Sequence, residues 1–63
     1  MIKVYDYEGK TYLLNEEEIS KIVESGVSGK WHGINCYIHL KDKSVIECRD
    51  SVQYIEQMIL KET

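Results

Sequence analysis

The chain has 63 residues, with 8 basic and 11 acidic side chains and a hydrophobic content of 43%, so we expect one small folded domain over residues 1–63. A chain this short buries only about 60% of its unfolded surface, which excludes a two-domain enzyme. The basic residues are scattered among acidic ones and the net charge is −3, so we expect no nucleic-acid partner.

The first predicted element is a β-hairpin. Ile2–Tyr7 is rich in β-branched and aromatic residues, the Glu-Gly pair at 8–9 supplies a turn, and Thr11–Leu14 forms the second strand. A two-residue turn places Tyr5 opposite Tyr12.

A short helix is predicted after this hairpin, from Asn15 to the Ser-Gly pair at 25–26. Asn15 is a good N-cap, and Glu18 follows it at the spacing of a capping box. The apolar side chains at i, i+3 and i+4 form a helical stripe. These are Ile19, Ile22 and Val23.

Residues 25–33 hold three of the four glycines and are expected to be irregular. A second hairpin follows, with strands over 34–40 and 44–49. A three-residue loop between them pairs Cys36 with Cys48 and Ile38 with Ile46 on one apolar face, and places Val45 on the other face. A shorter loop would place charged residues beside them, because a one-residue slip turns every side chain to the other face.

The last predicted element is a helix capped by Asp50, with Val52, Ile55 and Ile59 as its apolar stripe. The expected fold class is therefore α+β. It consists of two antiparallel β-hairpins with helices packed on one sheet face, in the order ββαββα.

The string LNEEEISKI, followed by a hairpin and then by DSVQYIEQMI, resembles the FlbD/SwrD family of small bacterial motility-associated proteins. Ile19 and Ile22 fall four and seven residues after Asn15, as in that family. The chain departs from the family by an insertion over 25–33 and by Lys43, where the family usually has Gly. The resemblance implies a cytosolic, non-catalytic accessory protein that supports flagellar motor output.

Four side chains could in principle hold a metal: His32, Cys36, His39 and Cys48. Cys36 and His39 lie three residues apart on a strand and therefore point to opposite faces, which argues against a zinc site and against a Cys-His catalytic pair. We expect no metal, no cofactor and no enzymatic activity. A cross-strand disulfide remains an alternative to two buried thiols, which a reducing cytosol favours.

The N-terminal segment lacks the apolar stretch of a signal peptide, and no apolar run approaches the ~18 residues of a membrane-spanning helix. We therefore expect a cytoplasmic protein without direct membrane insertion.

Surface aromatic residues supply the candidate contacts, because they bury large areas at interfaces while keeping a polar tip. The alternative is that several of them only cover the small core. The candidate binding residues are Tyr5, Tyr7, Tyr12, Trp31, Tyr37, His39 and Arg49.

Together these features predict a non-catalytic protein-binding accessory module that binds a protein partner and forms a homo-oligomer, with a dimer as the simplest case. The alternative is a phage or mobile-element protein that sequesters a small nucleotide-like ligand or inhibits a host defence protein.

Overall fold

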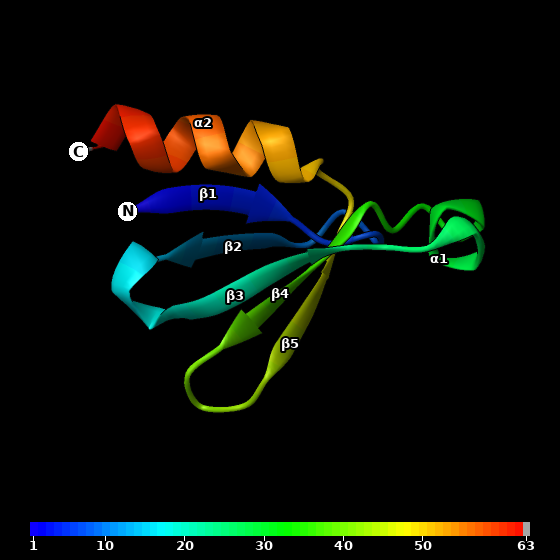
Figure 1. The fold of residues 1–63 in the computed structure, drawn as a ribbon, viewed down its shortest axis with the longest axis horizontal. Helices are drawn as coiled ribbons and strands as arrows, with labels where there is room; N and C mark the ends of the chain where they lie inside the picture. The colour runs from blue at the N-terminus through cyan, green and yellow to red at the C-terminus, as the bar shows by residue number, and fades with distance from the viewer. Residues whose placement is uncertain (63) are drawn as a thin grey trace.

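The computed structural model describes residues 1–62 and confirms an α+β fold with two antiparallel hairpins and a C-terminal helix. In chain order the elements are β1 (Ile2–Tyr5), β2 (Thr11–Leu14), the 3₁₀ helix η1 (Glu16–Glu18), β3 (Ile19–Glu24), α1 (Val27–Trp31), β4 (Cys36–Leu40), β5 (Val45–Cys48) and α2 (Val52–Glu62), as Figure 1 shows.

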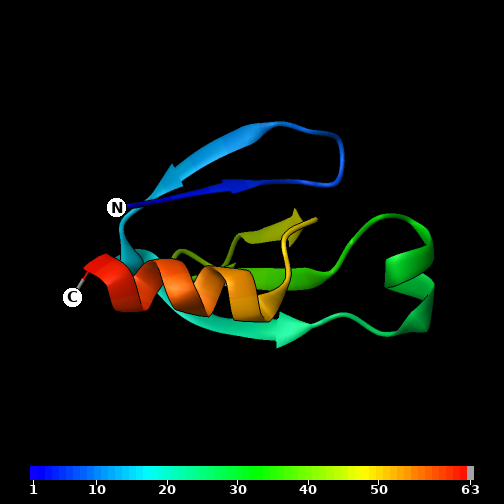
Figure 2. The same cartoon turned by 90° about the horizontal axis from the view of Figure 1, so that it is seen from above.

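The strands form a two-stranded sheet, β1-β2, and a three-stranded sheet, β3-β4-β5. The two sheets meet where β1 and β5 end. There, the Arg49 amide donates to the Tyr5 carbonyl at 3.0 Å, and an antiparallel bridge joins Asp6 to Cys48. Helix α2 contacts β1 and β3 and lies between the first hairpin and β3 (Figure 2). No helix within residues 1–62 is long and apolar enough to cross a membrane.

The core fills the space between the two sheets and α2. Ile55 is the fully buried side chain of the helix, and it joins a cluster contributed by β1, β2, β4 and β5. The other buried members of this cluster are Ile2, Val4, Leu14, Cys36, Ile38, Ile46 and Cys48. The alternation of buried and exposed residues along β1, β4 and β5 follows the two-residue period of a strand.

The register predicted for the second hairpin is confirmed. Cys36 pairs with Cys48 and Ile38 with Ile46, and the Leu40 amide donates to the Ser44 carbonyl across a three-residue loop.

Lys43, the last residue of that loop, has a φ of 75°, which is the left-handed region that usually selects glycine. A glycine at this position would adopt the same backbone conformation without steric cost.

The helix predicted over residues 15–26 is wrong. Only Glu16–Glu18 is helical, as a 3₁₀ turn, and Ile19–Glu24 forms the strand β3 along the edge of β4. A bulge between Ile19 and Lys21 inserts one residue, so that Ile19 and Ile22 pair with neighbouring inward-facing positions of β4. The bulge thus gives a strand the three-residue spacing that is typical of a helix. The predicted order ββαββα is therefore replaced by βββαββα, with the 3₁₀ turn η1 between the second and third strands.

The turn of the first hairpin is longer than predicted, so Tyr5 pairs with Thr11, not with Tyr12. The Asp6 carboxylate explains the longer turn, because it accepts hydrogen bonds from the Glu8 amide at 2.9 Å and from the Lys10 amide at 2.8 Å.

Two further predictions of local structure are wrong. Within 25–33, which was expected to be irregular, Val27–Trp31 forms the short helix α1. The cap of α2 is Ser51, whose hydroxyl accepts from the Tyr54 amide at 3.1 Å. The Asp50 carboxylate instead accepts from the Tyr5 amide of β1 at 3.1 Å.

Candidate functional site

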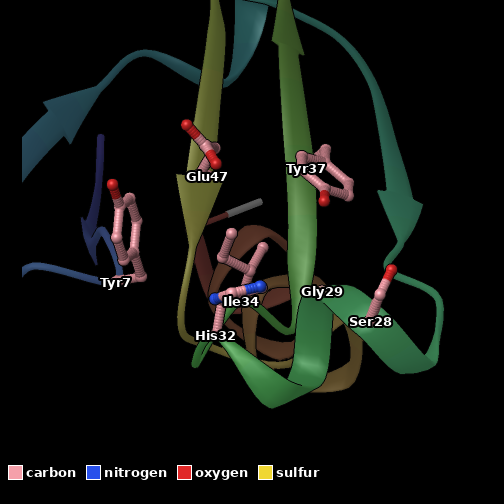
Figure 3. A pocket seen from close by; sticks show the side chains of 7 residues that line it. All are labelled: Tyr7, Ser28, Gly29, His32, Ile34, Tyr37 and Glu47. Atoms are coloured by element: carbon pink, nitrogen blue, oxygen red, sulfur yellow. The ribbon is translucent and has the colours of Figure 1, made fainter.

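A cavity of about 310 Å³ lies where the turn of the first hairpin, α1 and the outer face of β4 and β5 meet. Figure 3 shows its lining, which combines aromatic, acidic and small side chains. The lining residues are Tyr7, Ser28, Gly29, His32, Ile34, Tyr37 and Glu47.

Backbone pairing brings three of these side chains into one row. Tyr37 on β4 is the register partner of Glu47 on β5, and the Tyr7 amide donates to the Glu47 carbonyl at 3.0 Å. In Figure 3 the Glu47 side chain lies between the two tyrosine rings, with Ile34 and His32 below them. The row thus crosses from the first hairpin to the three-stranded sheet.

Helix α1 closes one side of the cavity because its loop is tied at the base. The Ser25 hydroxyl donates to the Ile34 carbonyl at 2.6 Å, and the Ile34 amide donates to the Gly29 carbonyl at 2.9 Å. A Cβ at Gly29 would lie 2.9 Å from the Ser25 Cβ and 3.2 Å from the Tyr37 hydroxyl. Glycine at this position therefore allows α1 to pack directly against β4.

The electrostatic environment at Tyr7 is negative. The carboxylates of Glu8 and Glu47, together with partial burial and Asp6, raise the pKa of Tyr7 above its ordinary value of 10.0. Burial by itself would raise the pKa of Asp6, but hydrogen bonds from Lys10, Glu8 and Tyr12 outweigh it and lower that pKa. Asp6 and Glu8 therefore add to the negative charge that Glu47 places near Tyr7.

The opposite face of α1 carries an exposed apolar pair. Trp31 is 84% exposed and Val27, four residues earlier on the same helical face, is 75% exposed. Between them in sequence, the Lys30 ammonium lies 3.6 Å from the Glu24 carboxylate. This face and the cavity are separated by the helix.

The predicted binding residues do not form one surface. Tyr7 and Tyr37 line the cavity, whereas Trp31 lies on the far face of α1. The remaining four are distributed over both sheets. The Arg49 guanidinium lies 4.9 Å from the centre of the Tyr5 ring. Tyr12 is half-buried, and its hydroxyl donates to the Asp6 carboxylate at 3.3 Å. His39 is half-buried on β4, between its register partners Lys21 and Val45.

Sequence reasoning did not single out Glu47, Ser28, Gly29 or Ile34 as site residues. A signal for Glu47 was present, because the predicted register already placed it opposite Tyr37. Ser28 and Gly29 belong to α1, which was not predicted, and Ile34 was predicted to begin the strand that in fact starts at Cys36.

The two cysteines are free thiols in the core. The Cys36 thiol donates to the Asp50 carbonyl at 3.2 Å. A hydrogen bond with Cys48, burial and the nearby Asp50 carboxylate raise the pKa of Cys36. Among residues 1–62, no three His, Cys, Asp or Glu side chains are grouped so that they could hold a metal ion.

Comparisons with protein-family models, with curated proteins and with solved structures find no match to this chain. The resemblance to the FlbD/SwrD family therefore stays a prediction.

Proposed function

We propose that this protein is a non-catalytic protein-binding module whose principal contact is the outer face of α1. The observation that carries the proposal is the 84% exposure of Trp31 beside the 75% exposure of Val27. Tryptophan is the residue type most enriched among the dominant contacts of protein interfaces. An indole this exposed gains a large apolar contact area when a partner covers it.

The α1 loop is held in place before any partner binds. Its base is closed by the bond between Ser25 and Ile34 and by a 3.1 Å bond from the Ser25 amide to the Asn35 carbonyl. Because the backbone that carries Trp31 is already ordered, binding requires less loss of conformational entropy.

The absence of catalysis is supported by the placement of the nucleophiles. Both thiols are buried in the core, and Cys36 donates to the Asp50 backbone, whereas His39 lies on the outer face of β4. The free buried thiols also support the proposal of a cytoplasmic protein, since a reducing compartment preserves them. A role in motility rests on the FlbD/SwrD resemblance alone.

The test is capture of partner proteins from a lysate of the native host by the immobilised protein. Trp31→Ala should weaken binding of the captured partner by roughly thirtyfold, which corresponds to about 2 kcal/mol for a dominant interface contact. Tyr54→Ala is the matched control, because Tyr54 is an exposed aromatic residue on α2. Equal binding by the two variants, or no captured partner, would contradict the proposal.

Self-association is the second part of the proposal, and the free edge of β3 supports it. Among the described strands β3 pairs only with β4, and an apolar groove of about 310 Å³ lies between β3 and α2. Ile19, Ile22 and Ile59 line this groove. A second copy paired along β3 would extend the sheet and cover the groove.

Sedimentation over a broad concentration range tests the dimer. We expect mass and melting temperature to rise with concentration, because association stabilises only the folded state. Val23→Lys should favour the monomer by placing charge at the edge strand, whereas Val45→Lys, at a similarly exposed valine on β5, should not. A monomer at all concentrations would contradict this part of the proposal.

The cavity beside α1 supports a second candidate function, the sequestration of a small molecule. Its carboxylate and its acidic surroundings disfavour the phosphate groups of a nucleotide-like ligand.

A further inference from the structure

We propose that the cavity between Tyr7 and Tyr37 binds an organic ammonium group. The cavity lies on the other side of α1 from Trp31, so this inference goes beyond the protein-binding function and does not depend on it.

The preference for a cation follows from the row formed by Tyr7, Glu47 and Tyr37. The carboxylate lies between two phenol rings, and backbone pairing on both sides of Glu47 holds this order. A cation above the carboxylate gains Coulomb attraction from Glu47 and is attracted to the electron-rich faces of the rings. Tyrosines grouped around a carboxylate are suited to quaternary or alkylated ammonium ions in particular.

The surrounding charges select a cation and disfavour an anion. Glu8 and Asp6 add negative charge at Tyr7, while no lysine or arginine among residues 1–62 lines the cavity. Three basic side chains have partners outside the cavity: Arg49 lies over the ring of Tyr5, Lys10 lies over the ring of Tyr12 and Lys30 pairs with Glu24. His32 also lines the cavity, and binding is measured at pH 8.

Shape and polarity are consistent with a small alkylated group. The volume of about 310 Å³ is near the lower end of small-ligand sites. The floor includes the buried side chain of Ile34, which offers apolar contact to methyl or methylene groups. Because Tyr7 is exposed, the site is open on one side, so the cationic end of a longer molecule can enter.

An ammonium of this kind is found both in free amines and in the lysine side chains of proteins. We therefore choose two quaternary cationic probes, choline and Nα-acetyl-Nε-trimethyl-lysine methylamide, and one neutral probe, the choline isostere in which carbon replaces the quaternary nitrogen. Each is titrated into the folded protein at pH 8 while the ring resonances of Tyr7 and Tyr37 are followed by NMR. Tighter binding of choline would identify a free small ammonium compound as the source, and tighter binding of the lysine derivative would identify a protein side chain.

We expect a cationic probe to shift both ring resonances and the neutral isostere to bind at least severalfold more weakly. Glu47→Gln should weaken cation binding by about threefold to tenfold, because it removes the charge and keeps the shape. Glu56→Gln, the same change at an exposed position on α2, is the matched control and should have no effect.

The contribution of the rings is tested at the exposed Tyr7. Tyr7→Phe should retain binding and Tyr7→Leu should weaken it severalfold, since only the former keeps a ring face. Trp31→Ala should leave cation binding unchanged. Equal affinity for choline and its neutral isostere, equal effects of Glu47→Gln and Glu56→Gln, or unshifted tyrosine resonances would each overturn the proposal.

Discussion

Replacement of Asp50 by alanine should destabilise the junction between the two sheets without affecting the start of α2. The Asp50 carboxylate accepts from the Tyr5 amide at 3.1 Å and lies 3.7 Å from the Cys48 thiol. Asp50→Ala leaves a partly buried backbone amide without its acceptor, which costs about 1–3 kcal/mol. Ser51→Ala is the matched variant, because it removes the actual cap of α2 and should cost about 0.5–2 kcal/mol.

The losses of stability expected for the two variants overlap in size. The variants are therefore distinguished by which amide loses its protection from hydrogen exchange. Denaturant unfolding gives the change in free energy, and amide hydrogen exchange locates it. Asp50→Ala should accelerate exchange at Tyr5, and Ser51→Ala should accelerate it at Tyr54. Faster exchange at Tyr54 with unchanged exchange at Tyr5 in Asp50→Ala would show that Asp50 caps the helix and would refute this reasoning.

Three further predictions concern the thiols, the second turn and the first turn. Cys36 and Cys48 are both fully buried, so a thiol reagent should label them only at the rate of unfolding, and rapid labelling of the folded protein would contradict their inward placement. Lys43→Gly should stabilise the protein by about 1 kcal/mol in thermal melts, because glycine adopts the φ of 75° without steric cost. An unchanged melting temperature would show that the Lys43 backbone is not strained. Asp6 has a folded-state pKa below its ordinary value of 3.8, so the stability it contributes is present above that pH and is lost as the pH falls through the lowered pKa. Urea unfolding at a series of acidic pH values should show Asp6→Asn to be less sensitive to acid than the wild type, and equal sensitivity would contradict the role of the carboxylate.

The second hairpin was predictable from sequence because its information is local. Residues 36–40 and 45–48 alternate in polarity, and only one loop length keeps the charged side chains at 47 and 49 out of the core. A one-residue slip would bury those charges, so the pattern allows a single register. The opposition of Tyr37 and Glu47, which forms half of the cavity row, follows from that register.

The segment 19–24 could not be assigned from its own residues. Its spacing of apolar side chains suits a helix, and it suits a strand only because the bulge after Ile19 adds a residue. The free edge of β4 decides between the two, since it supplies hydrogen bonds that an isolated segment does not have. Likewise, the sequence offers both Asp50 and Ser51 as caps, and the approach of β1 to the end of β5 draws the Asp50 carboxylate to the Tyr5 amide.

The α+β class, the core face of each strand in the second hairpin and the candidate aromatic residues all follow from the pattern of residues along the chain. Tertiary structure alone decided which of those aromatic residues meet. Tyr7 reaches Glu47 through a backbone bond between segments forty residues apart, and α1 separates Trp31 from both. Short-range periodicity encodes which side of a strand is buried, but it carries no information about which distant segments the folded core brings together.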